Sequence, residues 1–363
     1  MKIAILDNDI RVADPSLTTG VQTYGIHLQD GFTQLGIQAD LVGFTKSGRR
    51  VKAVDQCPQY NIHKISDRIE VLNRYDLIII LIGFFKPKEG DYEFLRQVNK
   101  KFIVIEHSND QSYRKHGYED LMKVIGKHPV VCNSKSSVVI YKNKYGIDAH
   151  LIHIPFSKNL MPEGVSKRTE NKPFQVVFPS RLLIFKKVDT AIHFMQEEIS
   201  DAFPWEFTAY GYASGTAIWW TDLKDQLDEN EENEIIPFID KRIRFERPYR
   251  REQLPEVYKN ADITFNTTQA KNDGGKLECV LLESIFYGVP VCIHDNWIKG
   301  VPPDQVDDTL IPNETYLPMD KEGILKFYND IEFRKRLIDK SQKMLEDHYD
   351  AKLVAQKFLN LIK

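Results

Sequence analysis

The chain has 363 residues, of which 42% are hydrophobic and 28% are charged, and its formal net charge is −3. This length exceeds what one hydrophobic core usually supports, so we expect two domains, and the balanced composition excludes a disordered chain. The small net charge does not by itself indicate a nucleic-acid or membrane partner, although a local basic surface is compatible with it.

The N-terminal residues 1–7 predict a β-strand and not a signal peptide, because their apolar run is short and leads directly into Asn8 and Asp9. No segment approaches the roughly twenty apolar residues that a membrane span needs. The 4 cysteines are widely spaced and form no CxxC pair, which argues against a zinc site or a disulfide framework. We therefore expect a cytoplasmic protein without a membrane partner.

Strand-like and helical segments then alternate along the chain, as in a doubly wound α/β fold with parallel sheets. A long amphipathic helix is predicted over 20–35. Further helices are predicted from Val188, Glu252 and Leu281. The predicted strands cover 2–7, 39–44, 76–84, 101–107, 129–133 and 150–155 in the first half, and 174–180, 205–212, 242–247, 261–266 and 289–295 in the second.

A polar segment with two prolines separates the two halves, which predicts an interdomain linker. The predicted organisation is one Rossmann-like domain over 1–157, a linker over 158–173, a second Rossmann-like domain over 174–335, and C-terminal helices over 336–363 that pack back toward the first domain. Two such domains facing each other enclose a cleft at the carboxyl edges of their sheets, where helix N-termini favour a nucleoside diphosphate.

The most informative segment is 277–291, which predicts a helix ending at Gly288 and then a buried strand. Glu283 is expected in the first turn of this helix, where its carboxylate can accept both hydroxyls of a ribose. The alternative is that Glu283 only interacts favourably with the helix dipole.

This segment resembles the retaining glycosyltransferases of the GT-B fold, in which two glutamates separated by seven residues precede a small-residue helix and a Gly-Val-Pro-Val sequence. The resemblance implies that Glu283 binds the nucleotide ribose. The first glutamate position falls on Gly275, and Glu278 is the nearest substitute for the donor-sugar contact. The spacing of Leu277-Glu278 and Leu282-Glu283 is similar to that of the bacteriophage DNA α-glucosyltransferases.

The same family places an arginine and a lysine after the first strand of the second domain, and Arg181 and Lys186 match these positions. Two fixed cations there stabilise the charge that develops on the leaving phosphate. The alternative is two solvated surface cations. The resemblance also implies that His107, after the strand 101–107, contacts the transferred sugar, although a lone histidine is more often structural.

Two further elements match the family at the nucleotide. Gly20 opens the first long helix, where backbone NH groups can approach a phosphate closely. The loop around Arg247 and Pro248 would pair its backbone with uracil. Asp7 and Asp9 imitate a metal motif, but GT-B enzymes typically work without that site, so we predict no metal. The implied donor is a UDP-sugar, UDP-glucose or a UDP-pentose, and the implied activity is that of a hexosyl- or pentosyltransferase.

Two acceptors compete. The first is double-stranded DNA with a hydroxymethylated pyrimidine, above all hydroxymethylcytosine in phage DNA, which would place the enzyme in the host cytoplasm. A basic loop with Lys46, Arg49, Arg50 and Lys52 could neutralise DNA phosphates, or could simply be a solvated loop. The second is an envelope polysaccharide or lipid-linked glycan, for which no basic amphipathic helix is found in the first domain. A non-enzymatic nucleotide-sugar-binding regulator is a further alternative.

Overall fold

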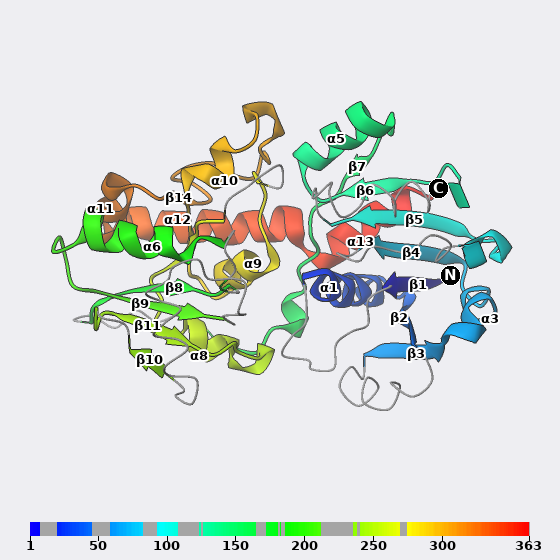
Figure 1. Cartoon of the computed structure of the whole chain (residues 1–363), viewed down its shortest axis with the longest axis horizontal. Coiled ribbons are helices and arrows are strands. Elements are labelled where there is room, and N and C mark those ends of the chain that lie inside the picture. The colour runs from blue at the N-terminus through cyan, green and yellow to red at the C-terminus, as the bar shows by residue number, and fades with distance from the viewer. Residues whose placement is uncertain are drawn as a thin grey trace. The chain divides into compact units, whose positions relative to one another are not determined.

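The computed structural model of the chain describes residues 1–7, 20–45, 59–82, 93–107, 123–124, 126–164, 172–180, 182, 186–211, 235–237, 240–268 and 274–362. The chain divides into two compact units, which Figure 1 shows. The first unit is Met1–Leu160 together with His348–Lys363, and the second is Met161–Asp347. Among the described residues, no helix is both long and apolar enough to cross a membrane.

The first unit is built on a parallel sheet with seven strands in its described part, in the order β3-β2-β1-β4-β5-β6-β7. The chain starts at a central strand and adds strands outward in both directions, which defines a doubly wound sheet. The strands are β1 (Lys2–Asp7), β2 (Gln38–Thr45), β3 (Tyr60–Lys64), β4 (Leu77–Ile82), β5 (Lys101–Glu106), β6 (Val130–Cys132) and β7 (His150–Leu151).

Helices cover both faces of this sheet. On one face, α1 (Gly20–Gln34) brings Gly25 into contact with Ile5, Leu41 and Leu81 of three adjacent strands. On the other face, α3 (Arg68–Leu72) and α5 (Lys135–Tyr145) pack on the alternate strand residues in one apolar cluster. The continuous apolar strands of the sequence therefore reflect burial on both sides.

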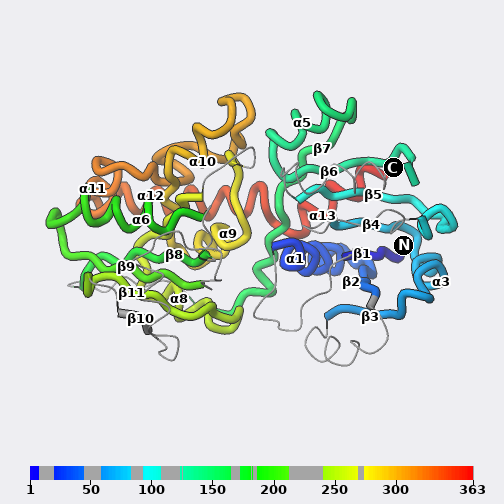
Figure 2. Tube along the Cα trace, in the orientation of Figure 1, coloured from blue at the N-terminus to red at the C-terminus, as the bar shows by residue number. Residues whose placement is uncertain are grey.

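The C-terminal helix α13 (Ala351–Asn360) packs against α1. The two backbones come so close that a Cβ atom on Gly31 would lie 2.1 Å from the carbonyl oxygen of Ala351. The chain is tied there by two backbone hydrogen bonds, from Phe156 N to Tyr349 O (2.7 Å) and from Ala351 N to Phe156 O (2.9 Å). Figure 2 traces this return, which leaves both termini in the first unit.

The second unit also has a seven-stranded sheet in its described part, in the order β10-β11-β9-β8-β12-β13-β14. Its strand pairs are parallel except that β10 runs antiparallel to β11. The strand order reverses between β8 and β12, which is the topological switch point of this sheet. The strands are β8 (Phe174–Phe178), β9 (Trp205–Tyr210), β10 (Ile235–Pro237), β11 (Ile243–Glu246), β12 (Ile263–Asn266), β13 (Val291–Ile293) and β14 (Leu317–Pro318).

Both faces of the second sheet are covered as well. One face carries a phenylalanine-rich core shared with α6, α11 and α12, and Figure 1 shows α6 beside the strands. On the other face, the Thr264 hydroxyl of β12 is hydrogen-bonded to the Ser284 hydroxyl of α9 at 2.6 Å. The helices are α6 (Val188–His193), α8 (Leu254–Tyr258), α9 (Cys279–Phe286), α10 (Asp295–Lys299), α11 (Lys321–Asn329) and α12 (Ile331–Met344).

The unit boundaries differ from those predicted at 158–173 and at 335/336. Residues 161–164 belong to the second unit, where Tyr287 Oη donates to Pro162 O (2.9 Å) and Gly164 packs on Pro255. The predicted boundary at 335/336 falls inside α12, which begins at its N-cap Asp330 and buries Phe333 and Leu337 in the second core. Because these contacts join distant residues, the sequence pattern alone did not locate the boundaries.

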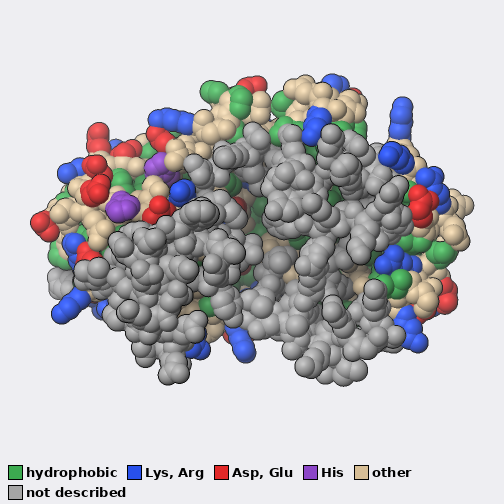
Figure 3. Space-filling view, in the orientation of Figure 1, with side chains coloured by type: hydrophobic (Ala, Val, Ile, Leu, Met, Phe, Trp, Pro, Cys, Tyr) green, Lys and Arg blue, Asp and Glu red, His purple; other side chains and the backbone are tan. Residues whose placement is uncertain are grey.

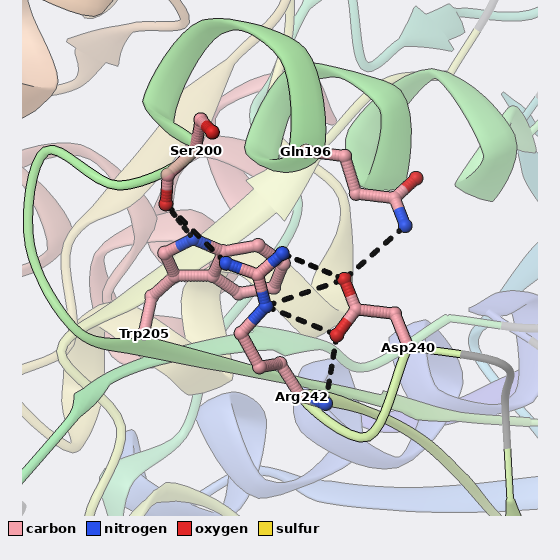
Figure 4. A network of polar contacts seen from close by, with 5 residues as sticks. All are labelled: Gln196, Ser200, Trp205, Asp240 and Arg242. Carbon is pink, nitrogen blue, oxygen red and sulfur yellow. Dashed lines mark hydrogen bonds and ion pairs between the residues drawn. The ribbon is translucent and has the colours of Figure 1, made fainter.

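A polar network stabilises the amino-terminal edge of the second sheet, and Figure 4 shows it. The Arg242 guanidinium lies over the Trp205 ring at 4.0 Å and binds the Asp240 carboxylate at 2.8 Å. Trp205 Nε1 and Arg242 Nη1 both donate to Ser200 O. The hydrogen bonds that Arg242 donates to the Asp240 carboxylate lower the pKa of Asp240 to about 2. The network lies where β9 and β11 begin, so its role is to hold the strands in place.

Candidate functional site

The candidate site lies at the carboxyl ends of β8 and β12, at the switch point of the second sheet. Open α/β sheets bind ligands at such a point, because the loops leaving adjacent strands there diverge to opposite faces. Three described segments meet here: the turn around Lys186 after β8, the residues Asn266–Thr268 at the end of β12, and the start of α9 at Glu278.

Lys186 is held through both its side chain and its backbone. Its Nζ donates to both carboxylate oxygens of Glu278, at 2.8 and 2.6 Å. Its carbonyl oxygen accepts from Thr267 Oγ1 at 2.8 Å. The Lys186 side chain is buried, whereas the Glu278 side chain is 28% exposed. The site therefore holds a preorganised ammonium group, neutralised by a carboxylate that can still reach a ligand.

Glu278 occupies the N-cap position of α9 in an extended conformation, and its side chain makes no capping hydrogen bond. The carboxylate instead pairs with Lys186, 92 residues away in sequence. The structure thus brings together two of the residues that the sequence predicted separately.

Gly275, on which the first glutamate position of the resembled pattern falls, lies in a tightly packed loop. Its φ of +71° is strained for other residues, and a Cβ atom there would lie 3.0 Å from Val301 Cγ2 and 3.1 Å from Val306 Cα. The loop is also anchored by hydrogen bonds from Gly275 N to Trp297 O (2.9 Å) and from Asp307 N to Gly275 O (2.7 Å). A side chain at position 275 would therefore require both a strained backbone and a shift of these neighbours.

Gly275→Ala is therefore expected to destabilise the second unit more than Gly288→Ala does. Both glycines have positive φ values, +71° and +78°, so both substitutions carry a similar backbone strain of roughly 1–2 kcal/mol. Only Gly275 is crowded by backbone, since the nearest atom to a Cβ at Gly288 is Gln342 Nε2 at 3.7 Å. Differential scanning calorimetry of the two variants measures the difference, and equal losses would contradict the crowding.

Glu283 lies in the second turn of α9, not in the first as predicted, because the helix begins at Cys279 and not near Leu281. The helix-dipole interpretation is weakened accordingly, since the dipole acts mainly within the terminal turn. The side chain is 8% exposed, and within the described residues no hydrogen bond reaches its carboxylate. Burial raises the pKa of Glu283 to about 7, against a smaller opposing effect of Arg251.

Tyrosines lie around Glu283, but their hydroxyls donate hydrogen bonds elsewhere and not to its carboxylate. The rings of Tyr258 and Tyr287 stack with centroids 5.4 Å apart. Each hydroxyl donates to a backbone carbonyl: Tyr249 to Pro179 (3.2 Å), Tyr258 to Val280 (3.2 Å) and Tyr287 to Pro162 (2.9 Å). These tyrosines form an apolar wall that leaves the carboxylate as an acceptor. The sequence prediction missed Arg251, Tyr258 and Tyr287, because a tyrosine at a helix end is typical of a packed core.

The other candidate site residues that the structure describes lie on elements other than the start of α9 and the turn around Lys186. Arg247 is exposed and Pro248 is half-buried, directly after β11. His107 follows β5 in the first unit and packs edge-on against Tyr24, with ring centroids 4.5 Å apart. Gly20 is the first residue of α1, and a Cβ atom there would meet nothing within 4 Å among the described residues, so packing does not require glycine.

Several predicted residues lie outside the described residues: Arg181, Lys46, Arg49, Arg50, Lys52 and Asp9. Asp7 is buried at the end of β1, where Tyr60 Oη donates to its carboxylate at 3.5 Å. In the part of the chain that the structure describes, no three His, Cys, Asp or Glu side chains are grouped so that they could hold a metal ion.

Comparison with known proteins identifies the fold through structure alone. No protein-family model matches the chain. No curated protein sequence matches it either. An α-glucosyltransferase in complex with UDP-glucose and DNA containing an abasic site is similar over 100% of both chains, with a TM-score of 0.73 and 14% sequence identity.

Two further solved structures show the same similarity. The match to HepE from Anabaena, in complex with UDP and glucose, covers 100% of this chain and 99% of the HepE chain, with a TM-score of 0.67 and 13% sequence identity. The match to sucrose-phosphate synthase from Thermosynechococcus elongatus covers 100% of this chain and 98% of the synthase chain, with a TM-score of 0.67 and 13% sequence identity. The chain therefore has the GT-B fold with two Rossmann-like units, which confirms the predicted fold class.

Proposed function

We propose that the protein is a retaining glycosyltransferase that moves a sugar from a UDP-sugar to a hydroxyl acceptor. The observation that carries the proposal is Glu283, a carboxylate that is 92% buried beside the switch point and accepts no hydrogen bond from the described residues. An ionised carboxylate in such a place is costly unless a ligand donates to it. The two adjacent hydroxyls of a ribose provide those donors.

The other residues fit the remaining parts of the donor. Lys186, together with Arg181, would hold the diphosphate and stabilise the charge that builds up on it as the glycosidic bond breaks. Glu278 would keep Lys186 in position and accept a hydroxyl of the transferred sugar, in the role that Gly275 cannot fill. The backbone around Arg247 and Pro248 would pair with uracil, Gly20 would allow close approach to a phosphate, and His107 would contact the sugar. No metal ion is required in this scheme.

For the acceptor, we propose hydroxymethylated cytosine in double-stranded phage DNA. The support is the similarity to the α-glucosyltransferase, which has also been solved with UDP and a 13-mer DNA containing an HMU base. In the face shown in Figure 3, acidic and basic side chains are interspersed over the described surface. The basic loop with Lys46, Arg49, Arg50 and Lys52, outside the described residues, is the candidate for phosphate contacts.

A cytoplasmic transferase of envelope polysaccharide or lipid-linked glycan synthesis is the second candidate. It is favoured by the similarity to HepE, which was solved in complex with UDP and glucose. The two candidates are separated by incubating the protein with a panel of UDP-sugars and DNAs that carry cytosine, hydroxymethylcytosine or hydroxymethyluracil. Nucleoside mass spectrometry then detects transfer. Transfer to none of these DNAs would favour the glycan acceptor.

If DNA is the acceptor, its binding is expected to weaken steeply with salt, with a log–log slope of roughly −0.9 per phosphate contact. Replacing Arg49 and Arg50 by alanine should flatten this slope by about two units and weaken all sequences alike. The same double variant should bind UDP as the parent does, because the loop belongs to the other unit. A DNA affinity that does not respond to salt would contradict the proposal for this loop.

A further inference from the structure

Asn266, the last residue of β12, presents a buried hydrogen-bond donor for which the described residues provide no partner. The residue is 4% exposed, and its Oδ1 accepts from Thr268 N at 3.2 Å. Its Nδ2 is completely buried and, within the described residues, has no hydrogen-bond partner. Leaving such a donor unsatisfied destabilises the folded protein, so its presence calls for a physical explanation.

The strand geometry places this amide at the candidate site. Side chains alternate between the two faces of a strand, and Thr264, two residues earlier, bonds to Ser284 of α9. Asn266 therefore faces the side of the sheet that α9 covers, at the end where this helix begins with Glu278. The next residue, Thr267, holds the Lys186 carbonyl. Asn266 thus lies at the switch point, together with the ion pair of Lys186 and Glu278.

The orientation of the amide is determined by its own hydrogen bond. Because Oδ1 is engaged by Thr268 N, the NH2 group points away from that turn. The neutral amide supplies donors, and the nearby Glu278 carboxylate supplies an acceptor. A sugar hydroxyl both accepts and donates, so it matches this pair. A diphosphate, by contrast, would bind the Lys186 ammonium and would be repelled by the Glu278 carboxylate.

We propose that Asn266 is a specificity-determining residue whose side-chain amide donates a hydrogen bond to a hydroxyl of the transferred sugar. This inference rests on the proposed function and adds a contact that the nucleotide part of the donor does not make. It also accounts for the buried amide nitrogen, because the ligand would supply the hydrogen bond that the described residues do not.

The test compares UDP with UDP-glucose and UDP-xylose by isothermal titration calorimetry. Asn266→Ala removes the amide, and Asn266→Ser removes it while keeping an oxygen that can accept from Thr268 N. Asn329→Ala, on the exposed end of α11 in the same unit, is the matched control. We expect both Asn266 variants to bind the UDP-sugar about five- to tenfold more weakly and UDP unchanged, since a neutral hydrogen bond contributes about that much. The control should bind both ligands normally.

Thermal unfolding monitored by circular dichroism accompanies the titrations. Since Nδ2 makes no hydrogen bond to the described residues, the Asn266→Ser variant should melt within a few degrees of the parent. Equal weakening of UDP and UDP-sugar, unchanged binding of both, or a large loss of stability in both variants would each overturn the inference. If the parent protein binds neither ligand, the proposed function itself fails, and this outcome is distinct from the other three.

Discussion

Replacing Lys186 by alanine is expected to lower kcat by about a hundredfold, or roughly 3 kcal/mol of transition-state stabilisation, with a smaller rise in KM. The ammonium is held by Glu278 at 2.6 Å and by the backbone contact to Thr267, so it is already in place before the donor binds. Its charge matters most when the phosphate leaves. Its removal also leaves the Glu278 carboxylate without this partner beside an anionic ligand.

Steady-state kinetics with a saturating acceptor measures the effect. Lys187→Ala is the control, because it makes the same change of charge at the adjacent residue, which the ion pair does not involve. Full activity in the double variant of Arg181 and Lys186 would refute the diphosphate role.

Activity should also survive EDTA, and complete inactivation by EDTA would refute metal independence.

The affinity for the donor is expected to rise as the pH increases through about 7, and this dependence should disappear in Glu283→Gln. The pKa of Glu283 is about 7 in the free protein, so near neutral pH the carboxyl is partly protonated. Hydroxyl donors from a ribose favour its ionised form, and binding must therefore release a proton below that pH. Glu283→Gln keeps the shape but loses charge-assisted bonds, which should weaken binding about tenfold.

The measurement uses a UDP-sugar instead of UDP, because a terminal phosphate with a pKa of about 6 would titrate in the same range. Calorimetry in two buffers with different ionisation enthalpies reports the proton release directly. An affinity that is independent of pH between 6 and 8, and unchanged in the glutamine variant, would contradict the ribose role.

The raised pKa of Glu283 also makes the stability of the folded protein depend on pH in a predictable direction. The pKa of Glu283 is raised on folding, so its contribution to stability is fully present below its unfolded pKa and is lost as the pH rises through about 7. In the absence of ligand, Glu283→Gln should consequently be more stable than the parent above pH 7. Thermal melts of both proteins at pH 6 and pH 8 test this difference.

Local patterns in the sequence were sufficient to predict both sheets and most of their strands. A strand buried on both faces needs an uninterrupted apolar run, and the segments of β4, β5 and β8 carry such runs. The edge strand β3 was not predicted, because it is only partly buried and its sequence YNIHK mixes polar with apolar residues. Glu283 and Lys186 were selected as candidate site residues because their positions relative to neighbouring elements resemble a family pattern.

Only the tertiary structure shows which contacts these residues make. Glu278 binds Lys186 only because β8 and β12 are neighbours, so that the turn after β8 lies beside the start of α9. Gly275 is crowded because Val301 and Val306, from a later loop, fill the space around it. Asn266 is ordinary in the sequence and is distinguished only by burial without a hydrogen-bond partner for its Nδ2 among the described residues. Each of these properties depends on contacts between segments far apart in the chain, which periodicity and local spacing do not encode.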